Sequence, residues 1–395
     1  MFLDVLRRRN PALLRAAVDL HRRGEIPANA YVLDLDAIGA NARLIAVEAK
    51  RLGLRVYAMT KQLGRNPVAI RTLAQNGIGA GVAVDLACAR ALVRAGAVLG
   101  HLGHLVQVPF HEAAEAAAMQ PEHWTVFSME KAAEASAAAA VLGRSQPLLA
   151  RVHATGDRFY PGHEGGFAAA DILRDAAAFD ELAGAHFAGV TTFPALLFDS
   201  DVGRVRATPN LTTLERVAER LRDAGRSGVE VNAPGTTSAQ TLQLLADAGA
   251  TQVEPGHALT GTTPWHAVAD LPELPAMLYL TEVSHTHAGR SYCFGGGLYV
   301  DPVFPPYQVR ALVGRDADEV LGRQVDAFLP PADAIDYYGQ LDVVARPADT
   351  VIFGFRAQAF VTRAAIVPVS GIADDEPRVE GVWTPHGQAS GDAAR

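Results

Sequence analysis

Short apolar runs alternate with longer stretches of helical spacing over the first two thirds of the chain. An apolar run of about four to eight residues predicts a buried strand, and apolar residues three or four apart predict a helix, as at 86–95 and 211–224. The predicted strands cover residues 56–59, 79–84, 103–108, 124–127, 148–153, 187–192, 229–232 and 252–254. Strands that alternate with helices in this way favour an α/β fold, a (β/α)8 barrel of the TIM type. A flavodoxin-like open sheet is the alternative, although it needs fewer repeats.

The pattern changes on both sides of this region. Residues 1–29 predict a helix and a connection that serve as an accessory, and residues 31–36 predict a strand outside the barrel. After Trp265, apolar runs broken by glycine and proline predict a second, mostly β domain. From Gly371 the chain is polar, and we expect a loosely held or disordered tail. The predicted domains are residues 1–29, 30–268, 269–370 and 371–395.

Composition excludes several classes of protein. The chain has 395 residues, 49% of them apolar and 20% charged, which is ordinary for a globular enzyme. Its formal net charge of -8 provides no basic surface, so we expect no nucleic-acid partner. No apolar run approaches the length of a membrane span, and the N-terminus lacks the layout of a secretory signal. With only Cys88 and Cys293, a disulfide framework is excluded, and we expect a cytoplasmic protein.

Polar side chains follow the predicted strands, at the end where a barrel carries its chemistry. Lys61 follows the first strand, and its amine can form a Schiff base with an aldehyde cofactor when its surroundings lower its pKa. Small residues and hydroxyls at 232–238 and 254–257 follow the seventh and eighth strands, where barrels often bind phosphate. Together these groups can hold the two ends of pyridoxal phosphate. Taken singly, Lys61 can also be a surface lysine, and 235–238 can be a helix cap.

Three stretches make this pattern specific. They are Met-Thr-Lys-Gln-Leu-Gly-Arg-Asn-Pro at 59–67, Glu-Pro-Gly-His-Ala-Leu-Thr-Gly at 254–261 and Tyr-Cys-Phe-Gly-Gly-Gly at 292–297. Their order and spacing resemble the alanine racemase-like family of pyridoxal phosphate enzymes, fold type III, over roughly residues 30–365. The stretch 59–67, with Asp199 and residues 256–263, is most similar to the YhfX subgroup. The resemblance implies an N-terminal (β/α)8 barrel, a C-terminal β domain and a Schiff base on Lys61.

The chain departs from the alanine racemases at three places. Glu254 stands where they have an arginine facing the pyridine nitrogen, as in the basic amino-acid decarboxylases of the same fold type. A carboxylate there keeps the ring nitrogen protonated and makes the ring a stronger electron sink, although Glu254 could instead pair with a nearby arginine. Thr191 and Thr192 replace a histidine that lies against the ring. Cys293 and Phe294 replace a tyrosine base from the partner subunit, so Cys293 is either the proton carrier or a buried inert cysteine.

The resemblance implies a racemase-like enzyme that uses pyridoxal phosphate to remove and return the Cα proton of an amino acid. Lys61 and Cys293 would act on opposite faces of the substrate, the cysteine coming from the second chain of a head-to-tail homodimer. The implied cofactor site comprises Lys61, His153, Thr192, Asn232, Thr236, Thr237, Ser238, Glu254, Gly256 and His257. The candidate substrate residues are Arg158, Tyr160, Tyr338 and Arg356. A decarboxylase or lyase is one alternative, and a non-catalytic cofactor carrier is another, although such carriers lack a C-terminal β domain.

The remaining polar residues carry weaker signals. Arg151 is a further candidate for contact with a substrate carboxylate or the cofactor O3′. His101 and His104 flank a glycine of the predicted third strand without a spacing specific to metal sites, and His285 and His287 have no cysteine at a credible zinc spacing. We therefore predict no metal site and interpret both histidine pairs as polar lining or surface.

Overall fold

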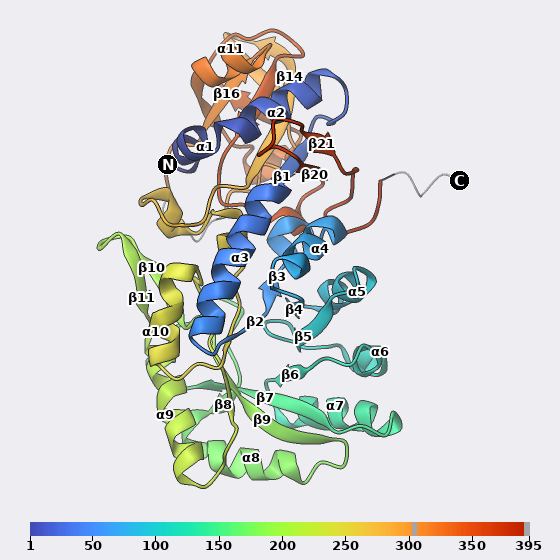
Figure 1. Ribbon diagram of the computed structural model, residues 1–395, viewed down its shortest axis with the longest axis vertical. Helices are drawn as coiled ribbons and strands as arrows, with labels where there is room; N and C mark the ends of the chain where they lie inside the picture. The colour runs from blue at the N-terminus through green and yellow to red at the C-terminus, as the bar shows by residue number, and fades with distance from the viewer. Residues whose placement is uncertain (302–305, 391–395) are drawn as a thin grey trace. The chain divides into compact units, whose positions relative to one another are not determined.

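The computed structural model describes residues 1–301 and 306–390, which form two compact units (Figure 1). The barrel unit comprises Arg43–Thr60 and Leu73–Gly256, and the β unit comprises Met1–Ala42, Lys61–Thr72 and His257–Arg395. Each unit therefore gathers segments that are far apart in the sequence, unlike the continuous domains predicted above. Lys61 begins a segment of the β unit although it directly follows the first barrel strand.

A parallel sheet that closes on itself forms the centre of the barrel unit. Its strands pair in the order β2-β13-β12-β9-β7-β6-β5-β4-β3. β2 and β3 are halves of one strand interrupted at Tyr57, and this strand pairs with β13 at one edge and with β4 at the other. The predicted (β/α)8 barrel is thus confirmed. Its strands are β2 (Arg55–Val56), β3 (Ala58–Met59), β4 (Ala80–Ala83), β5 (Val98–Leu102), β6 (His123–Val126), β7 (Gln146–His153), β9 (Ala185–Thr191), β12 (Glu230–Asn232) and β13 (Gln252–Val253).

Helices follow the barrel strands along the chain, and α5 to α9 lie outside the ring of strands (Figure 1). The helices that follow barrel strands are α4 (Pro67–Gln75), α5 (Leu86–Arg94), α6 (Ala113–Ala118), α7 (Met129–Val141), α8 (Ile172–Asp180), α9 (Pro209–Asp223) and α10 (Leu242–Asp247), and α3 (Leu35–Arg51) precedes the first barrel strand. Short strands extend the loops: β8 (Phe167–Ala168) pairs with β7, and β10 (Leu196–Asp199) pairs with β11 (Arg204–Ala207). Among the described residues, no helix is long and apolar enough to cross a membrane.

The third barrel strand lies five residues earlier than predicted. β5 is Val98–Leu102, and residues 103–108 form no strand. Gly103 has a φ of +77°, a conformation that ends an extended run. The two neighbouring segments are similarly apolar, so their composition did not distinguish them. The displacement matters because it places His101 on the strand itself.

A nine-stranded sheet forms the β unit, in the order β15-β18-β17-β16-β19-β14-β1-β20-β21. The mostly β C-terminal domain is confirmed, and the strand predicted outside the barrel, β1, pairs with β14 and β20 in this sheet. The apolar side chains of α1 and α2 pack against the sheet and form its core. The strands are β1 (Ala30–Asp34), β14 (Met277–His287), β15 (Arg290–Phe294), β16 (Arg310–Gly314), β17 (Gln324–Phe328), β18 (Tyr338–Leu341), β19 (Thr350–Phe353), β20 (Ala365–Ser370) and β21 (Arg378–Val379), and the helices are α1 (Phe2–Arg9), α2 (Pro11–Arg22) and α11 (Ala317–Gly322).

The segment that follows Gly371 is packed as far as Ser390, so the expectation of a loosely held tail is wrong for these residues. β21 pairs with β20, and the backbone of Trp383 exchanges two hydrogen bonds with Ile366, at 3.0 and 2.8 Å. Gly387 lies so near the Arg65 carbonyl that a Cβ atom would come within 2.3 Å of its oxygen. Backbone hydrogen bonds hold this segment in place, which its polar composition does not predict. The rest of the predicted tail, 391–395, lies outside the described residues.

Candidate active site

Glu254 is the most deeply buried acid at the carboxyl end of the barrel strands, with 4% of its surface exposed. Its Oε1 accepts two hydrogen bonds, from His101 Nδ1 at 2.5 Å and from Asn232 Nδ2 at 2.9 Å. Its Oε2 lies 3.5 Å from His104 Nδ1 and accepts no hydrogen bond from any residue that the structure describes. Burial raises the pKa of Glu254, but the charges of His104 and His101 and the bonds to Oε1 outweigh burial and lower it. Glu254 is therefore an ionised carboxylate with one oxygen occupied and one available.

His101 and His104 are buried beside this carboxylate, which agrees with their interpretation as polar lining and not with that as surface. His101 is 0% exposed, and its Nε2 lies 2.5 Å from Thr125 Oγ1. The displaced third strand hid its position, because residues inside the barrel are recognised only when the strand register is known. The alternation of side chains along 98–102 would have directed His101 inward had that strand been assigned.

Among the described residues, His101, His104 and Glu254 form a group that could hold a metal ion, because their possible ligand atoms lie within 4.8 Å of one another. The separation of 2.5 Å between His101 Nδ1 and Glu254 Oε1 is that of a hydrogen bond. Two ligands about 2.1 Å from one tetrahedral ion would lie about 3.4 Å apart. The geometry thus describes a hydrogen-bonded network of acid and histidines.

Hydroxyl groups gather after β12, where a phosphate was expected. Thr237 and Ser238 are 2% and 1% exposed, and neither hydroxyl has a hydrogen-bond partner among the described residues. The backbone N–H groups of 236–238 already bond to Leu196 O, Gly235 O and Thr241 Oγ1. An anion would therefore be held here by the side chains of Thr237 and Ser238, not by the backbone. The two buried, unpartnered hydroxyls fit a phosphate group.

Asn232 takes another place than the phosphate site that the resemblance implied, whereas nothing in the structure tests the place of Thr192 beside the ring. Asn232 is fully buried, accepts a hydrogen bond from Thr191 Oγ1 at 2.7 Å and donates to Glu254. Its amide is committed to the carboxylate, so it does not belong to a phosphate site. Thr192 is 1% exposed.

Arg151 is a buried cation on β7 that forms no ion pair with any described residue. It is 1% exposed; its guanidinium lies 4.6 Å from the ring centre of Phe127 and 5.6 Å from that of Phe159. Its Nη1 has no partner in the described chain, and its Nη2 reaches only Phe193 O at 3.5 Å. Burial lowers the pKa of Arg151 to about 10, while the charge of Glu164 opposes this change.

The loop after β7 carries the other predicted residues. Asn210 binds both backbone groups of Arg158, at 2.8 and 2.9 Å, whereas the Arg158 side chain is exposed. Tyr160 packs against Phe193, and His153 packs edge-on against Phe159. Arg158 is thus held by its backbone, and its side chain lies exposed, unlike the buried side chain of Arg151.

Lys61 lies in the β unit, at the start of a short 3₁₀ helix, η1 (Lys61–Leu63). Its Nζ lies 5.4 Å from the ring centre of Phe360, and the Arg65 guanidinium lies 5.3 Å from the same ring. Arg65 Nη1 also lies 3.2 Å from His386 Nδ1, so the C-terminal segment supports this turn. The side chain of Lys61 is half-buried.

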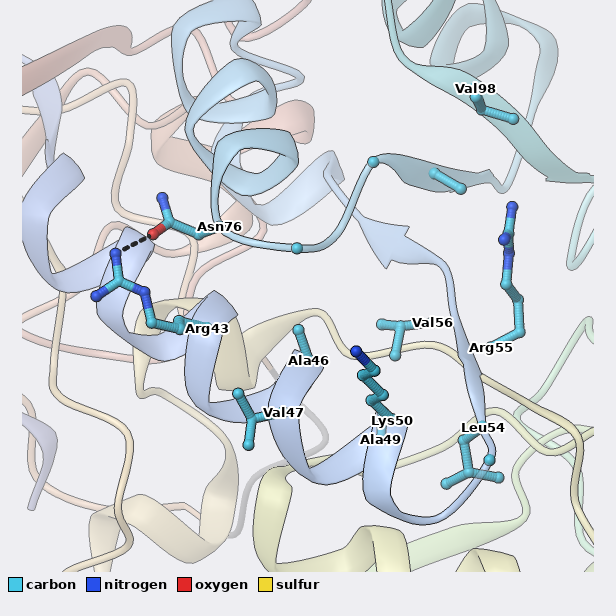
Figure 2. Close-up of a pocket in the computed structure, with 14 residues that line it drawn as sticks. Arg43, Ala46, Val47, Ala49, Lys50, Leu54, Arg55, Val56, Asn76 and Val98 are labelled. Atoms are coloured by element: carbon cyan, nitrogen blue, oxygen red, sulfur yellow. Dashed lines mark hydrogen bonds between the residues drawn. The ribbon is translucent and has the colours of Figure 1, made fainter.

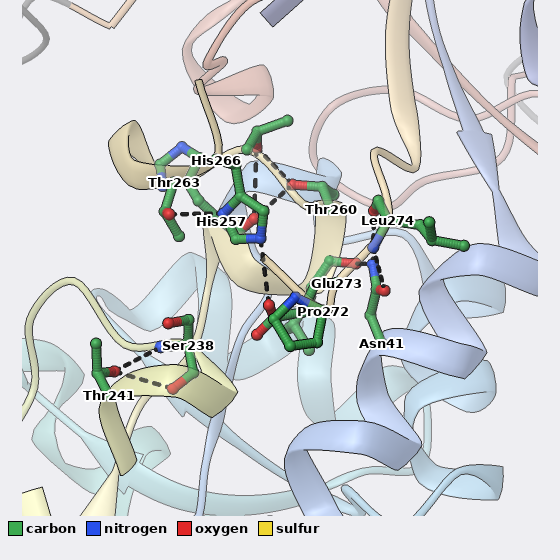
Figure 3. A network of polar contacts seen from close by, with 12 residues as sticks. Asn41, Ser238, Thr241, His257, Thr260, Thr263, His266, Pro272, Glu273 and Leu274 are labelled. Carbon is green, nitrogen blue, oxygen red and sulfur yellow. Dashed lines mark hydrogen bonds and ion pairs between the residues drawn. The ribbon is translucent and has the colours of Figure 1, made fainter. Parts of the chain in front are cut away.

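His257 begins η5 (His257–Thr260), which a network of side chains holds in place (Figure 3). Its Nε2 donates to Ala357 O at 2.9 Å. Burial, the charge of Arg356 and that of Lys61 lower the pKa of His257 well below its ordinary value, so the ring is neutral. In the same network Asn41 donates to Leu259 O and Leu274 O, at 3.1 and 2.8 Å.

Three predicted residues of the β unit differ in how accessible they are. Arg356 Nη1 pairs with the buried Asp301 at 3.0 Å, whereas Tyr338 is 40% exposed. Cys293 is 0% exposed; its Sγ points to Gly339 O at 3.6 Å, and burial raises its pKa to about 12. A thiol in this environment stays protonated at neutral pH, which favours the alternative of a buried inert cysteine.

A groove of about 700 Å³ lies at the opposite end of the barrel strands (Figure 2). Leu54, Gly79 and Val98 line it at the points where their strands begin. Barrels carry their chemistry at the carboxyl ends of the strands, so this groove is not the reaction site.

Comparison with known proteins identifies the family. Residues 33–264 match the family described as alanine racemase, N-terminal domain, and residues 278–379 match the YhfX-like C-terminal domain. The chain belongs to the alanine racemase family. It is 41% identical to the protein YhfX of Escherichia coli (strain K12), over 99% of this chain and 100% of that protein. The resemblance to the YhfX subgroup is confirmed.

Solved structures share the fold at low sequence identity. D-threonine aldolase from Filomicrobium marinum has a TM-score of 0.66 and 18% identity, over 92% of this chain and 96% of that chain. Alanine racemase of Clostridium difficile 630 has a TM-score of 0.60 and 14% identity, over 91% and 99%. D-threo-3-hydroxyaspartate dehydratase from Delftia sp. HT23 has a TM-score of 0.64 and 18% identity, over 89% of this chain and 96% of that chain. Enzymes of this fold family use pyridoxal phosphate and include more than one reaction, so the fold alone does not determine the chemistry.

Proposed function

We propose that the protein is a pyridoxal phosphate enzyme that removes and returns the Cα proton of an amino acid, as a racemase does. The observation that carries this proposal is Glu254, a buried and ionised carboxylate with its Oε2 free of hydrogen bonds from the described chain. Such an oxygen fits the protonated nitrogen of a pyridine ring. The bound cofactor supplies an electron sink that acidifies the Cα–H bond of an amino acid joined to it.

The chain's residues divide the remaining tasks. Lys61 Nζ would hold the cofactor covalently and, once released by the substrate amine, would accept and return the Cα proton on its own face. The hydroxyls of Thr237 and Ser238 would donate hydrogen bonds to the phosphate. The half-buried Thr236 and the neutral His257 are further candidates beside it, with Gly256 leaving room.

Arg151 would bind the substrate carboxylate. A planar guanidinium can form two parallel hydrogen bonds to a carboxylate, which fixes both the position and the orientation of the substrate. Its Nη1, which has no hydrogen-bond partner within the described chain, supports this role. Tyr160 and the exposed Arg158 and Tyr338 stay candidates for the rest of the substrate.

Inversion at Cα requires a second proton carrier on the other face. We propose a head-to-tail homodimer as its source, because the β domain of this family completes the partner's site. The buried thiol of Cys293 is poorly suited to this role, since a group with a pKa of about 12 is a weak acid near neutral pH.

A decarboxylase or lyase is the second candidate, and Glu254 favours it because a protonated ring also stabilises the carbanion left by loss of carbon dioxide. Incubation of the cofactor-loaded protein with single enantiomers of amino acids distinguishes the two. Appearance of the opposite enantiomer, with Cα–H exchange in deuterium oxide, is expected for the proposal. Release of carbon dioxide or cleavage of the Cα–Cβ bond without inversion would replace it by the second candidate.

A further inference from the structure

Glu254 is part of a chain of buried polar contacts that no cofactor-binding role explains. Thr125 Oγ1 lies 2.5 Å from His101 Nε2, and His101 Nδ1 donates to Glu254 Oε1 at 2.5 Å. On the other side, Thr191 bonds to Asn232, whose amide donates to the same oxygen. All five residues are at most 4% exposed. Polar side chains of four barrel strands, β5, β6, β9 and β12, are thus linked by hydrogen bonds to one carboxylate.

We infer that His101 is a positioning residue that keeps Glu254 ionised and directs its Oε2 toward the ligand. This inference rests on the proposed function, in which Glu254 accepts a hydrogen bond from the ring nitrogen of the cofactor. It assigns a task to a histidine that would not itself touch cofactor or substrate.

Hydrogen bonds fix the orientation of the Glu254 carboxylate. Two donors on Oε1, 2.5 and 2.9 Å away and from different strands, fix the rotation of the carboxylate about its last bond. The other oxygen then has one direction in which it can accept a hydrogen bond. Because Oε1 already accepts two hydrogen bonds, only Oε2 can accept one from a ring nitrogen.

The partners of the two ring nitrogens determine where His101 carries its proton. Thr125 can donate to Nε2 of a neutral ring or accept from Nε2 of a charged ring, since a hydroxyl does both. In either case the proton on Nδ1 points to Glu254, because the carboxylate can only accept. His101 is therefore a donor to Glu254 in both of its charge states, and the carboxylate, which can only accept, fixes the proton on Nδ1.

The charges and hydrogen bonds around Glu254 also determine its protonation state. A carboxylate without charged or hydrogen-bonding neighbours in such a site would take up a proton, because burial disfavours its charged form. A protonated Glu254 could not hold a proton on the ring nitrogen, and the electron sink would weaken. His104 contributes at longer range, 3.5 Å from Oε2, and its ring meets that of His101 edge-on at 5.5 Å.

Infrared difference spectroscopy on the cofactor-free protein tests the inference without any activity measurement. The band of a protonated carboxylic acid is assigned to Glu254 by its loss in Glu254→Gln. We expect no such band in the parent at neutral pH, its appearance in His101→Phe, and its absence in His101→Asn, whose amide can still donate. An unchanged spectrum in His101→Phe, or the band in both variants, would overturn the inference.

A second measurement uses pyridoxal phosphate labelled with ¹⁵N in the ring. The nitrogen should be protonated in the parent and in His101→Asn and unprotonated in His101→Phe, with turnover lower in His101→Phe on the order of tenfold to a hundredfold. His186→Phe, which alters an exposed histidine on β9, is the matched control and should behave as the parent. A protonated nitrogen in His101→Phe would refute the inference. If the parent bound no cofactor, the proposed function would fail, whereas the infrared result would still decide what His101 does to Glu254.

Discussion

Replacing Arg151 with methionine should stabilise the cofactor-free protein, although the arginine is buried. Its guanidinium forms no ion pair in the described chain, and burial lowers its pKa from 12.5 to about 10. At 1.36 kcal/mol for each pKa unit, this difference corresponds to about 3 kcal/mol of unfavourable free energy in the folded state. A methionine has a similar length and no charge to desolvate.

The sign of this effect depends on pH in a defined way. Below about pH 10 the arginine is charged in both the folded and the unfolded chain, so the whole penalty is present at neutral pH. It declines only as the pH rises through about 10. The contacts with Phe127 and Phe159 offset it by about 1–2 kcal/mol. The expected gain for Arg151→Met at pH 7 is therefore about 1–2 kcal/mol in the free energy of unfolding.

Urea unfolding of the cofactor-free protein at pH 7 measures this quantity. Arg55→Met is the matched control, because Arg55 is exposed and paired with Glu122 at 2.7 Å; its change should stay within about 0.5 kcal/mol. The same Arg151→Met protein should lose its preference for amino acids over amines that lack a carboxylate. If Arg151→Met were less stable than the parent by more than about 1 kcal/mol, the arginine would serve the fold, and the reasoning would be refuted.

Three further predictions concern the proposed site. Glu254→Gln should retain the cofactor but exchange the Cα proton more slowly by on the order of a hundredfold, because a neutral amide does not keep the ring protonated; equal exchange rates would assign Glu254 another role. Thr237→Val combined with Ser238→Ala should weaken cofactor binding by about 3–6 kcal/mol, seen in equilibrium dialysis, since each hydroxyl contributes about 1.5–3 kcal/mol to a charged partner; unchanged affinity would place the phosphate elsewhere. Cys293→Ala should change turnover by less than about threefold, because the thiol has a pKa of about 12 and is fully buried; loss of inversion with retained Cα–H exchange would instead restore the cysteine as the second proton carrier.

Local patterns predicted much of the fold. Alternating strands and helices gave the barrel, and the change of texture after Trp265 located the β domain. The division into two units could not be predicted from local pattern. β1 pairs with the distant strands β14 and β20, and residues 30–34 alone do not indicate these partners. The packed segment around Trp383 was missed for the same reason.

Site residues were predictable where a residue of suitable chemistry follows the end of a predicted strand. Lys61 and Glu254 follow barrel strands directly, so the place where each strand ends was sufficient to select them. The role of Asn232 was missed, because only the structure shows that its amide faces Glu254 and not an anion. His101 was missed because its strand was assigned five residues too late, which hid the direction of its side chain.

Reduction with borohydride followed by peptide mapping tests the central claim most directly. The chain has three lysines, which makes the assignment unambiguous: Lys50, Lys61 and Lys131. Lys50 lines the groove at the far end of the barrel, and Lys131 bonds to Glu134 and Val108 O. We expect the protein incubated with pyridoxal phosphate to carry the reduced label on Lys61, to retain it in Lys50→Ala and Lys131→Ala, and to lose it in Lys61→Ala. A label of the same stoichiometry in Lys61→Ala, or none in the parent, would contradict the account.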